Sequence, residues 1–424
     1  MKVVHIINAD TRGGAPKAAY SLHKALLSSG IDSRMLVQRK FSNDDKVSSY
    51  NSSFVQTQLT NSRMLLDIIQ MKLFSKEERG RFSFASIGKD ISDNPIIKEA
   101  DIFHLHWINE GYLSLKSLQQ LAKLGKPVVW TLHDMWAFTG GCHYSSGCKK
   151  YEDVCCNCPY LKNPSSKDFS TRLQQKKSEV YNELKPHFIT CSNWLAKTAK
   201  ASSLLKDYNA AAIPNPIDVD VYKPLDKKAV RKKLGLSENK KYILFGTLNV
   251  NEERKGFKKL VEALNILFTR QENLKADTEL LIYGTASGDE TKTLPAKVNS
   301  FGRITDTQHL VECYNAADVF VAPSLEDNLP NTVMESLACG IPVVTFNIGG
   351  MPDMIEHNLN GYLAEPFSTD DFAEGIKLLL NDEQNQKKLS AQAREKVLGN
   401  YQPFIVAARY QSIYNKLLSS QINF

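Results

Sequence analysis

The chain has 424 residues, of which 42% are hydrophobic and 23% are charged, and its formal net charge is +7. This length exceeds one hydrophobic core, so we expect two domains of an ordinary globular protein. No apolar run approaches the ~20 residues of a membrane span, and the opening KVVHIIN lacks the features of a signal peptide. The protein is therefore expected to be cytoplasmic, where eight cysteines argue against a disulfide framework.

Charge is unevenly distributed between the two halves of the chain. Residues 1–215 contain 29 Lys and Arg against 19 Asp and Glu, whereas the remainder contains 24 against 27. A basic first half suits an anionic membrane surface or a diphosphate-linked lipid, and it predicts peripheral membrane contact. The alternative is that the Lys-rich helices serve only solubility. Nucleic acid is not an expected partner, because the basic residues are dispersed and form no recognised binding motif.

The first half alternates short apolar runs with helical patterns, which is typical of a doubly wound parallel sheet. We expect strands at residues 2–8, 33–38, 101–107, 127–133 and 187–191. Residues 41–100 interrupt this alternation with Ser- and Asn-rich sequence and a helical segment near 60–73. We interpret this interruption as an insertion near the acceptor side of the protein.

Gly13 and Gly14 lie between the first expected strand and the first helix. Two glycines let backbone amides approach a ligand without an intervening side chain. The segment TRGGA lacks the GxGxxG fingerprint of dinucleotide-binding proteins, so a plain turn is the alternative.

Three histidines lie on expected strands of the first half. His133 ends a buried strand, where a doubly wound domain keeps its active site; the alternative is a core histidine bonded to the backbone. His104 and His106 alternate on one strand and therefore share a face. His106 is nearer the strand end and beside Trp107, so it is the better candidate for an acceptor site, and His104 is expected to be structural.

Five cysteines fall within 17 residues. The spacing of Cys142, Cys148, Cys155 and Cys158 supplies four thiolates, and the final CxxC is a common half of a metal site. Four sulfurs in a reducing compartment favour a tetrahedral structural Zn(II) site, a zinc knuckle. Unliganded thiols and an iron–sulfur or redox site are the alternatives, and Cys156 could replace one ligand.

The segment IPNPID, residues 213–218, followed by a charged run, is typical of a junction between domains. A second alternation then predicts strands at 242–246, 279–284, 298–302, 319–324 and 342–346, and the last patterned segment, about 385–419, is long and helical. We therefore predict an N-terminal domain over 1–215, with a Cys-rich insertion at about 140–160, and a C-terminal domain over 216–400.

Residues 318–350 contain the pattern that says most about function. A buried strand is followed by a loop, a helix that begins at Pro330-Asn331, and a second apolar strand, PVVTF. The loop lies at the carboxyl end of the sheet, where open α/β folds bind ligands. Asp327 lies in this loop and Glu335 lies about two turns into the helix. Helix-start amides can hold an anion while carboxylates accept hydroxyl protons, which predicts a nucleotide sugar; an ordinary solvated surface helix is the alternative.

Asp327 and Glu335, separated by seven residues and followed by CGIPVV, resemble the signature of family 4 retaining glycosyltransferases of the GT-B fold. The resemblance covers nearly the whole chain. It implies two Rossmann-like domains facing each other across a cleft, with a C-terminal helix at about 400–424 that packs back on the first domain. Most members have Glu-Gly-Phe at the loop, whereas this chain has Asp327-Asn328-Leu329-Pro330.

The resemblance also implies roles for individual residues. His133 would hold the sugar, Arg254 and Lys255 would bind the diphosphate, and Asp327 and Glu335 would bind the sugar and the ribose. Thr247 stands where members usually have Arg, so Arg254 is expected to supply that charge. Further donor contacts are expected from Gly13, Gly14, Gly246, Arg303, Asn328, Leu329, Pro330, Asn331 and Thr332. The cysteine block that follows His133-Asp134-Met135-Trp136 is similar to one in exopolysaccharide and colanic-acid members of the family.

The expected function is a retaining glycosyltransferase that moves a hexose-type sugar from a nucleotide diphosphate sugar to a saccharide or lipid-linked acceptor. UDP-sugars are the first expected donors and GDP-sugars the second. No divalent metal is expected at the donor, because no Asp-x-Asp pair follows a strand and side-chain cations can replace the metal. A nucleotide-sugar epimerase of the same shape, a non-catalytic nucleotide-sugar-binding scaffold and a zinc-based regulator are the alternatives.

Overall fold

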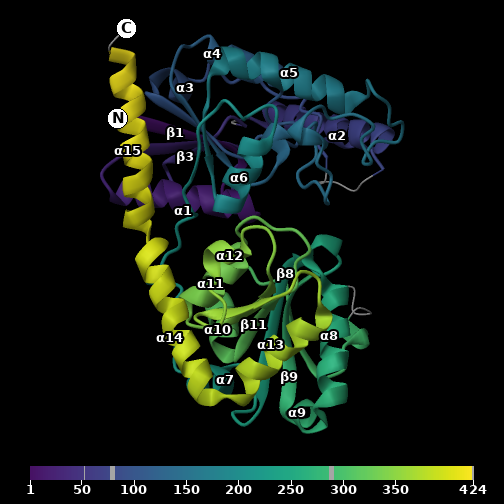
Figure 1. Ribbon diagram of the computed structural model, residues 1–424. Coiled ribbons are helices and arrows are strands. Elements are labelled where there is room, and N and C mark those ends of the chain that lie inside the picture. The colour runs from purple at the N-terminus through teal and green to yellow at the C-terminus, as the bar shows by residue number, and fades with distance from the viewer. Residues whose placement is uncertain (52, 77–81, 286–290, 423–424) are drawn as a thin grey trace. The chain divides into compact units, whose positions relative to one another are not determined.

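A computed structural model describes residues 1–51, 53–76, 82–285 and 291–422, and the chain divides into two compact units (Figure 1). Unit 1 contains Met1–Pro216 and Pro403–Phe424, and unit 2 contains Ile217–Gln402. Residues 423–424, at the end of the predicted C-terminal helix, lie outside the described residues. Each unit is built on one parallel sheet, so the predicted pair of Rossmann-like domains is confirmed.

Unit 1 has a seven-stranded parallel sheet with the order β3-β2-β1-β4-β5-β6-β7. Its elements are β1 (Lys2–Ala9), α1 (Gly14–Ser28), β2 (Asp32–Arg39), β3 (Val47–Ser49), α2 (Phe54–Phe74), α3 (Pro95–Glu99), β4 (Ile102–Leu105), α4 (Leu115–Ala122), β5 (Val128–Leu132), η1 (Trp136–Phe138), η2 (Lys150–Glu152), α5 (Phe169–Leu184), β6 (His187–Thr190), α6 (Asn193–Ala201), β7 (Ala210–Ala212) and α15 (Pro403–Ile422). The strand order reverses between β1 and β4, which is the position where open α/β sheets bind ligands.

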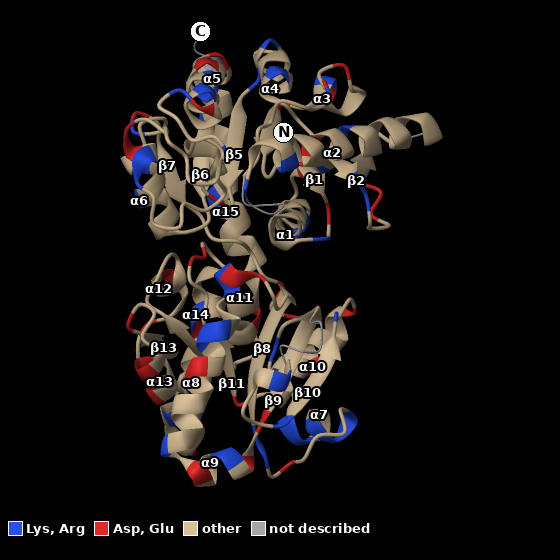
Figure 2. Cartoon of the chain, turned by 90° about the vertical axis from the view of Figure 1, so that its right-hand side faces the viewer, with Lys and Arg blue, Asp and Glu red and all other residues tan. Residues whose placement is uncertain are grey.

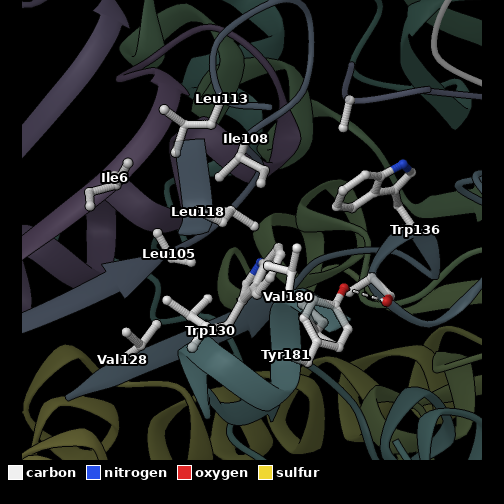
Figure 3. Packing of buried hydrophobic residues seen from close by; sticks show 14 of the residues in the cluster. Ile6, Leu105, Ile108, Leu113, Leu118, Val128, Trp130, Trp136, Val180 and Tyr181 are labelled. Atoms are coloured by element: carbon white, nitrogen blue, oxygen red, sulfur yellow. Dashed lines mark hydrogen bonds between the residues drawn. The ribbon is translucent and has the colours of Figure 1, made fainter. Parts of the chain in front are cut away.

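The strands of unit 1 read as continuous apolar runs because helices cover both faces of the sheet. On one face, Ile6 of β1, Leu105 of β4 and Trp130 of β5 belong to one buried cluster with Tyr181 of α5 (Figure 3). The Tyr181 hydroxyl donates a hydrogen bond to the Ala137 carbonyl at 2.6 Å, which satisfies the polar end of this aromatic side chain.

The opposite face of the unit 1 sheet is covered by α1 and by α15, which lie side by side (Figure 1). Val3 of β1 and Ile102 of β4 pack there with Leu22 of α1 and with Val406 and Tyr410 of α15. The last helix of the chain therefore completes the core that the first strand begins.

Unit 2 has a six-stranded parallel sheet with the order β10-β9-β8-β11-β12-β13. Its elements are α7 (Lys227–Lys233), β8 (Lys241–Asn249), η3 (Glu253–Lys255), α8 (Phe257–Arg270), α9 (Glu272–Asp277), β9 (Thr278–Thr285), η4 (Thr291–Thr293), β10 (Val298–Gly302), α10 (Thr307–Ala316), β11 (Val319–Ala322), α11 (Asn331–Ala338), β12 (Val343–Phe346), α12 (Met351–Met354), β13 (Gly361–Ala364), α13 (Thr369–Asn381) and α14 (Glu383–Asn400). Its order reverses between β8 and β11, so the predicted ligand loops after these two strands lie at the switch point.

Two expectations about the elements are corrected by the structure. The single helical segment expected at about 385–419 is two helices, α14 and α15, because Pro403 has no N–H to continue the first. The segment expected near 60–73 begins earlier, at Phe54, where the Ser53 side chain accepts a hydrogen bond from the Gln56 amide. Within the described residues, no helix combines the length and apolar character needed to cross a membrane.

Candidate active site

The loop between β11 and α11 places a carboxylate beside the start of a helix. Pro330 is the N-cap residue of α11, and no side chain caps the helix there. The backbone amide of Asn328 donates to Asp327 Oδ1 at 3.0 Å, so the carboxylate is fixed by its own loop. The start of α11, at the positive end of the helix dipole, is a position that favours an anion.

A turn with two cationic side chains, which follows β8 on the other side of the switch point, contacts the Asp327 carboxylate. The turn η3 follows β8, and Lys255 Nζ lies 2.7 Å from Asp327 Oδ2. Arg254 lies 3.2 Å from the same oxygen, but it also pairs with Glu252 at 2.6 Å and donates to the Glu326 carbonyl. Glu252 offsets the charge of Arg254, so Lys255 is the cation better placed to act on a ligand.

Two glycines allow this close approach of backbone segments. Gly256 has φ +71, and a Cβ there would lie 1.8 Å from the Pro323 carbonyl oxygen. Gly349 has φ +53, and a Cβ there would lie 2.0 Å from the Asp327 carbonyl oxygen. No other residue type fits either position, so the glycines hold three loops together around Asp327.

Asp327 is 5% exposed and remains ionised. Burial alone would raise the pKa of Asp327, but the charges of Lys255 and Arg254 outweigh burial and lower this pKa below its usual value. The pairing has a consequence for a ligand, because an incoming anion would compete with Asp327 for the Lys255 ammonium.

Glu335 projects from α11 into a group of tyrosines. Its Oε2 accepts a hydrogen bond from the Tyr314 hydroxyl at 2.8 Å, and its Oε1 accepts one from Tyr222 at 3.4 Å. The Tyr283 hydroxyl lies 2.6 Å from that of Tyr314. Burial raises the pKa of Tyr222, Tyr283 and Tyr314, and the Glu335 charge raises each further. These hydroxyls stay protonated, and those of Tyr314 and Tyr222 hold the Glu335 carboxylate in place by hydrogen bonds. The sequence did not predict these tyrosines.

The remaining expected donor residues of unit 2 divide into two groups. Leu329 and Asn328 are buried in the loop beside Asp327, and Asn331 and Thr332 form the first turn of α11. Gly246 has a packing role, because a Cβ there would lie 1.9 Å from the Tyr283 ring. Arg303 follows β10, an edge strand two places from β8, and is exposed.

In unit 1, the glycine loop lies beside a buried carboxylate that the sequence analysis did not single out. Gly13 has φ +114 and is the N-cap residue of α1, and Gly14 is the first residue of that helix. Asp10 is fully buried and accepts hydrogen bonds from the backbone amides of Thr11, Phe41 and Ser42. Its position directly after the first strand was the available signal.

A row of histidines crosses the centre of the unit 1 sheet. His106 Nε2 lies 2.9 Å from His5 Nδ1, and His106 Nδ1 lies 3.1 Å from His133 Nε2. His104 is bonded to the hydroxyls of Tyr414 and Thr131, each at 2.7 Å. Burial lowers the pKa of His133 to about 4 and holds the pKa values of His5, His104 and His106 well below 6.5.

This arrangement corrects the role expected of His106. Its ring is 3% exposed and both ring nitrogens are engaged by His5 and His133, so it supports His133 from beneath rather than facing an acceptor. His133 keeps partial exposure at the end of β5, as expected for a residue that touches a ligand. His104 is structural, as expected.

Asp134 and His143 form a second polar pair that the sequence analysis had passed over. His143 Nδ1 lies 2.7 Å from Asp134 Oδ2, and Trp107 Nε1 donates to the same oxygen at 2.9 Å. Burial would raise the pKa of Asp134, but His143 and the surrounding donors lower it. The pair ties the loop after His133 to the start of the cysteine segment.

The cysteines line one small cavity of about 20 Å³, which is large enough for a single water or ion. Its lining includes Cys142, Cys148, Cys155, Cys156 and Cys158. A metal site needs at least three ligand atoms close together. Among the described residues, however, the group of three whose possible ligand atoms all lie within 4.8 Å of one another consists of histidines, His5, His104 and His106. Five of their six ring nitrogens are engaged in the hydrogen bonds given above, whereas His5 Nε2 has no hydrogen-bond partner within the described part of the chain. A metal ion would have to displace those bonds, so we take the cysteine cavity as the better metal candidate.

Comparison with known proteins places both halves of the chain among similar sequences. Residues 226–396 match the family model "Glycosyl transferases group 1". A protein of Escherichia coli K12 named for colanic acid biosynthesis, glycosyl transferase WcaC, is 26% identical over 344 residues, which cover 78% of this chain and 80% of the relative. N-acetyl-alpha-D-glucosaminyl L-malate synthase of Bacillus anthracis is 27% identical over 53% of this chain and 61% of its own length.

Solved structures share the fold over the full chain at low identity. Sucrose-phosphate synthase from Thermosynechococcus elongatus has a TM-score of 0.66 at 16% identity and covers 99% of this chain and 100% of its own. Anabaena HepE in complex with UDP-glucose has a TM-score of 0.62 at 16% identity, with the same coverage.

Proposed function

We infer that this chain, a member of the group 1 glycosyltransferases of family 4 with the GT-B fold, moves a hexose-type sugar from a nucleotide diphosphate sugar with retention of configuration. The observation that carries the proposal is the convergence of Lys255 and Arg254 on Asp327, at the start of the helix that carries Glu335. All four residues lie within the segment 226–396 that matches the family model.

In the proposed mechanism, the protein supplies charge and position rather than a nucleophile. Negative charge develops on the diphosphate as the glycosidic bond breaks, and Lys255 and the α11 amides would stabilise it. The acceptor hydroxyl would attack from the face that the diphosphate leaves, and a phosphate oxygen would take its proton. Asp327 would then bind the sugar and Glu335 the ribose, each through hydroxyl groups.

The proposed donor is a UDP-sugar, with a GDP-sugar as the second candidate. Support comes from the fold shared with Anabaena HepE, which was solved with UDP-glucose. The proposed acceptor is a saccharide or lipid-linked saccharide of a surface polysaccharide, in keeping with the name of the Escherichia coli relative. Because such acceptors lie at a membrane, we also propose peripheral contact with its surface.

Replacement of Glu335 with Gln tests the donor site. We expect the wild-type protein to be stabilised against heat by one class of nucleotide sugar and to transfer or hydrolyse it. Loss of a charged hydrogen bond of about 1.5–3 kcal/mol should weaken donor binding roughly 10- to 100-fold. Glu312→Gln is the control, because Glu312 is equally buried but pairs with Lys233 on α7. A wild-type protein that binds donor but neither transfers nor hydrolyses it would support a scaffold instead.

We propose a structural zinc ion in the cysteine cavity, held by Cys142, Cys148, Cys155 and Cys158. Burial raises the pKa of Cys155 and Cys158 to about 11, and the amide donors, from Gly140 to Cys155 Sγ at 3.1 Å and from the following turn to Cys158, offset this only in part. A bound zinc ion would supply the positive charge that holds both sulfurs as thiolates. The fully buried ammonium of Lys177 is close enough to interact electrostatically with Cys142 and Cys155. A tetrathiolate zinc site carries net negative charge, which this ammonium would offset.

The zinc proposal predicts one zinc per chain by elemental analysis of protein purified without added metal. Removal by a chelator should lower the melting temperature by roughly 5–10 °C, if bound metal contributes about 2.7 kcal/mol. The double variant Cys155→Ser, Cys158→Ser should contain no zinc, whereas the control Cys156→Ser should retain it. A metal-free wild-type protein with an unchanged melting temperature would leave these cysteines as unliganded thiols.

A further inference from the structure

Helix α2 of unit 1 presents large apolar side chains to solvent along its whole length. Seven of them are between 43% and 77% exposed: Phe54, Val55, Leu59, Leu65, Leu66, Ile69 and Leu73. Isolated exposed leucines are common on protein surfaces, but a contiguous group of this size on one helix marks an interaction site. The transfer site proposed above makes no use of this helix.

Five of the seven exposed apolar side chains, Val55, Leu59, Leu66, Ile69 and Leu73, form a straight stripe. Val55 and Leu73 are separated by 18 residues, which is five turns at 3.6 residues per turn. Leu59, Leu66 and Ile69 fall between them at helical spacing on the same side. The opposite side of α2 packs on the protein, where Thr60 and Met71 are buried. The stripe is therefore a stable, outward-facing feature of a well-anchored helix.

The unit that carries the stripe is basic as a whole. Unit 1 contains 31 Lys and Arg against 19 Asp and Glu, a surplus of 12, whereas unit 2 contains 22 against 27. Three exposed lysines, Lys72, Lys76 and Lys162, gather at the C-terminal end of α2, where Lys162 donates to the Lys72 carbonyl. In the view of Figure 2 most of α2 itself is uncharged.

We propose that α2 docks unit 1 onto an anionic lipid surface, with the stripe immersed at the level of the lipid headgroups. This deepens the peripheral membrane contact proposed above by naming the element that makes it. An interfacial helix lies in the plane of the membrane, so a straight apolar stripe with lysines at its C-terminal end fits a flat anionic surface. The helix does not cross the bilayer, because its apolar residues occupy one side only.

A second copy of this chain is a less favourable occupant of the stripe. Pairing two units that each carry a surplus of 12 positive charges would bring like charges together, whereas an anionic surface offsets them. The stripe and the lysines thus favour the same partner by independent physical effects.

Flotation of the full-length protein with lipid vesicles tests this inference. We expect binding to vesicles that contain phosphatidylglycerol, weaker binding to pure phosphatidylcholine, and release of much of the bound protein at about 1 M salt. The variant Leu59→Gln, Leu66→Gln, Leu73→Gln should lower the fraction bound by about tenfold or more. Leu248→Gln is the matched control, because Leu248 of unit 2 is 62% exposed. Since these leucines are exposed, the variants should fold normally and still bind the donor.

Three results would overturn the inference. Wild-type protein that does not float with anionic vesicles would refute it, and so would a triple variant that floats as well as the wild type. A wild-type dimer in light scattering that becomes monomeric in the triple variant would assign the stripe to self-association. Loss of donor binding in the wild type would instead count against the proposed transfer reaction, so the two failures are distinguishable.

Discussion

Replacing Lys255 with Ala should reduce kcat by about 10²- to 10³-fold, which corresponds to about 2.7–4 kcal/mol of lost transition-state stabilisation. The ammonium lies 2.7 Å from Asp327, at the N-terminal end of α11, where the leaving diphosphate is expected. Arg254 should compensate only in part, because it also pairs with Glu252 at 2.6 Å. The positive charge that stabilises the leaving group in the proposed mechanism therefore depends mainly on one side chain.

Steady-state kinetics with the preferred nucleotide sugar would measure this effect. Lys255→Arg should retain more activity than Lys255→Ala, because it keeps the charge, and Lys258→Ala, an exposed lysine one turn further along, should behave like the wild type. A Lys255→Ala enzyme with an unchanged kcat and a raised KM would show that Lys255 binds ground state and transition state equally. That result would contradict its proposed role on the leaving group.

Unfolding free energy should fall steeply as the pH is lowered from about 6.5 to 5. Burial lowers the pKa values of His5, His104 and His106 well below 6.5 in the folded protein, so these rings stay neutral. In the unfolded chain they take up protons below pH 6.5, and stability is therefore lost as pH falls through that value. Each histidine contributes about 1.4 kcal/mol per pH unit, so three contribute roughly 4 kcal/mol per unit.

Urea unfolding at several pH values between 7.5 and 5 would measure this slope, above the range where carboxylates titrate. The variant His104→Gln can keep hydrogen bonds to Tyr414 and Thr131. It should lower the slope of unfolding free energy against pH by the amount that corresponds to about one proton taken up on unfolding. His309→Gln is the control, because the His309 side chain is 38% exposed. Stability that did not change between pH 7.5 and 5 would mean that the buried histidines are not neutral in the folded state.

The central strands and the helices between them could be predicted because each is a short apolar run bounded by turn residues. The edge strands β3 and β7 could not, because each is only three residues long, and the edge strand β13, Gly361–Ala364, was missed as well. β7 is also Ala210–Ala212, a sequence with no β-branched residue.

The site was predictable where its residues are neighbours in sequence and not where they meet only in space. Asp327 and Glu335 share one loop and helix, so spacing alone located them. Glu252 neutralises Arg254, and Tyr314 fixes Glu335, but neither contact has a sequence pattern of its own. The acceptor role predicted for His106 was wrong. Alternation along a strand shows which residues share a face of the sheet, but it does not show whether other side chains bury that face.

The packing of α15 on unit 1 separates that unit into two stretches of sequence with unit 2 between them. The apolar face to which Val3 belongs is covered by Val406 and Tyr410, so residues 217–402 are synthesised before this face can be covered. A chain that stopped before Pro403 would therefore be expected to expose the face to chaperones and proteases.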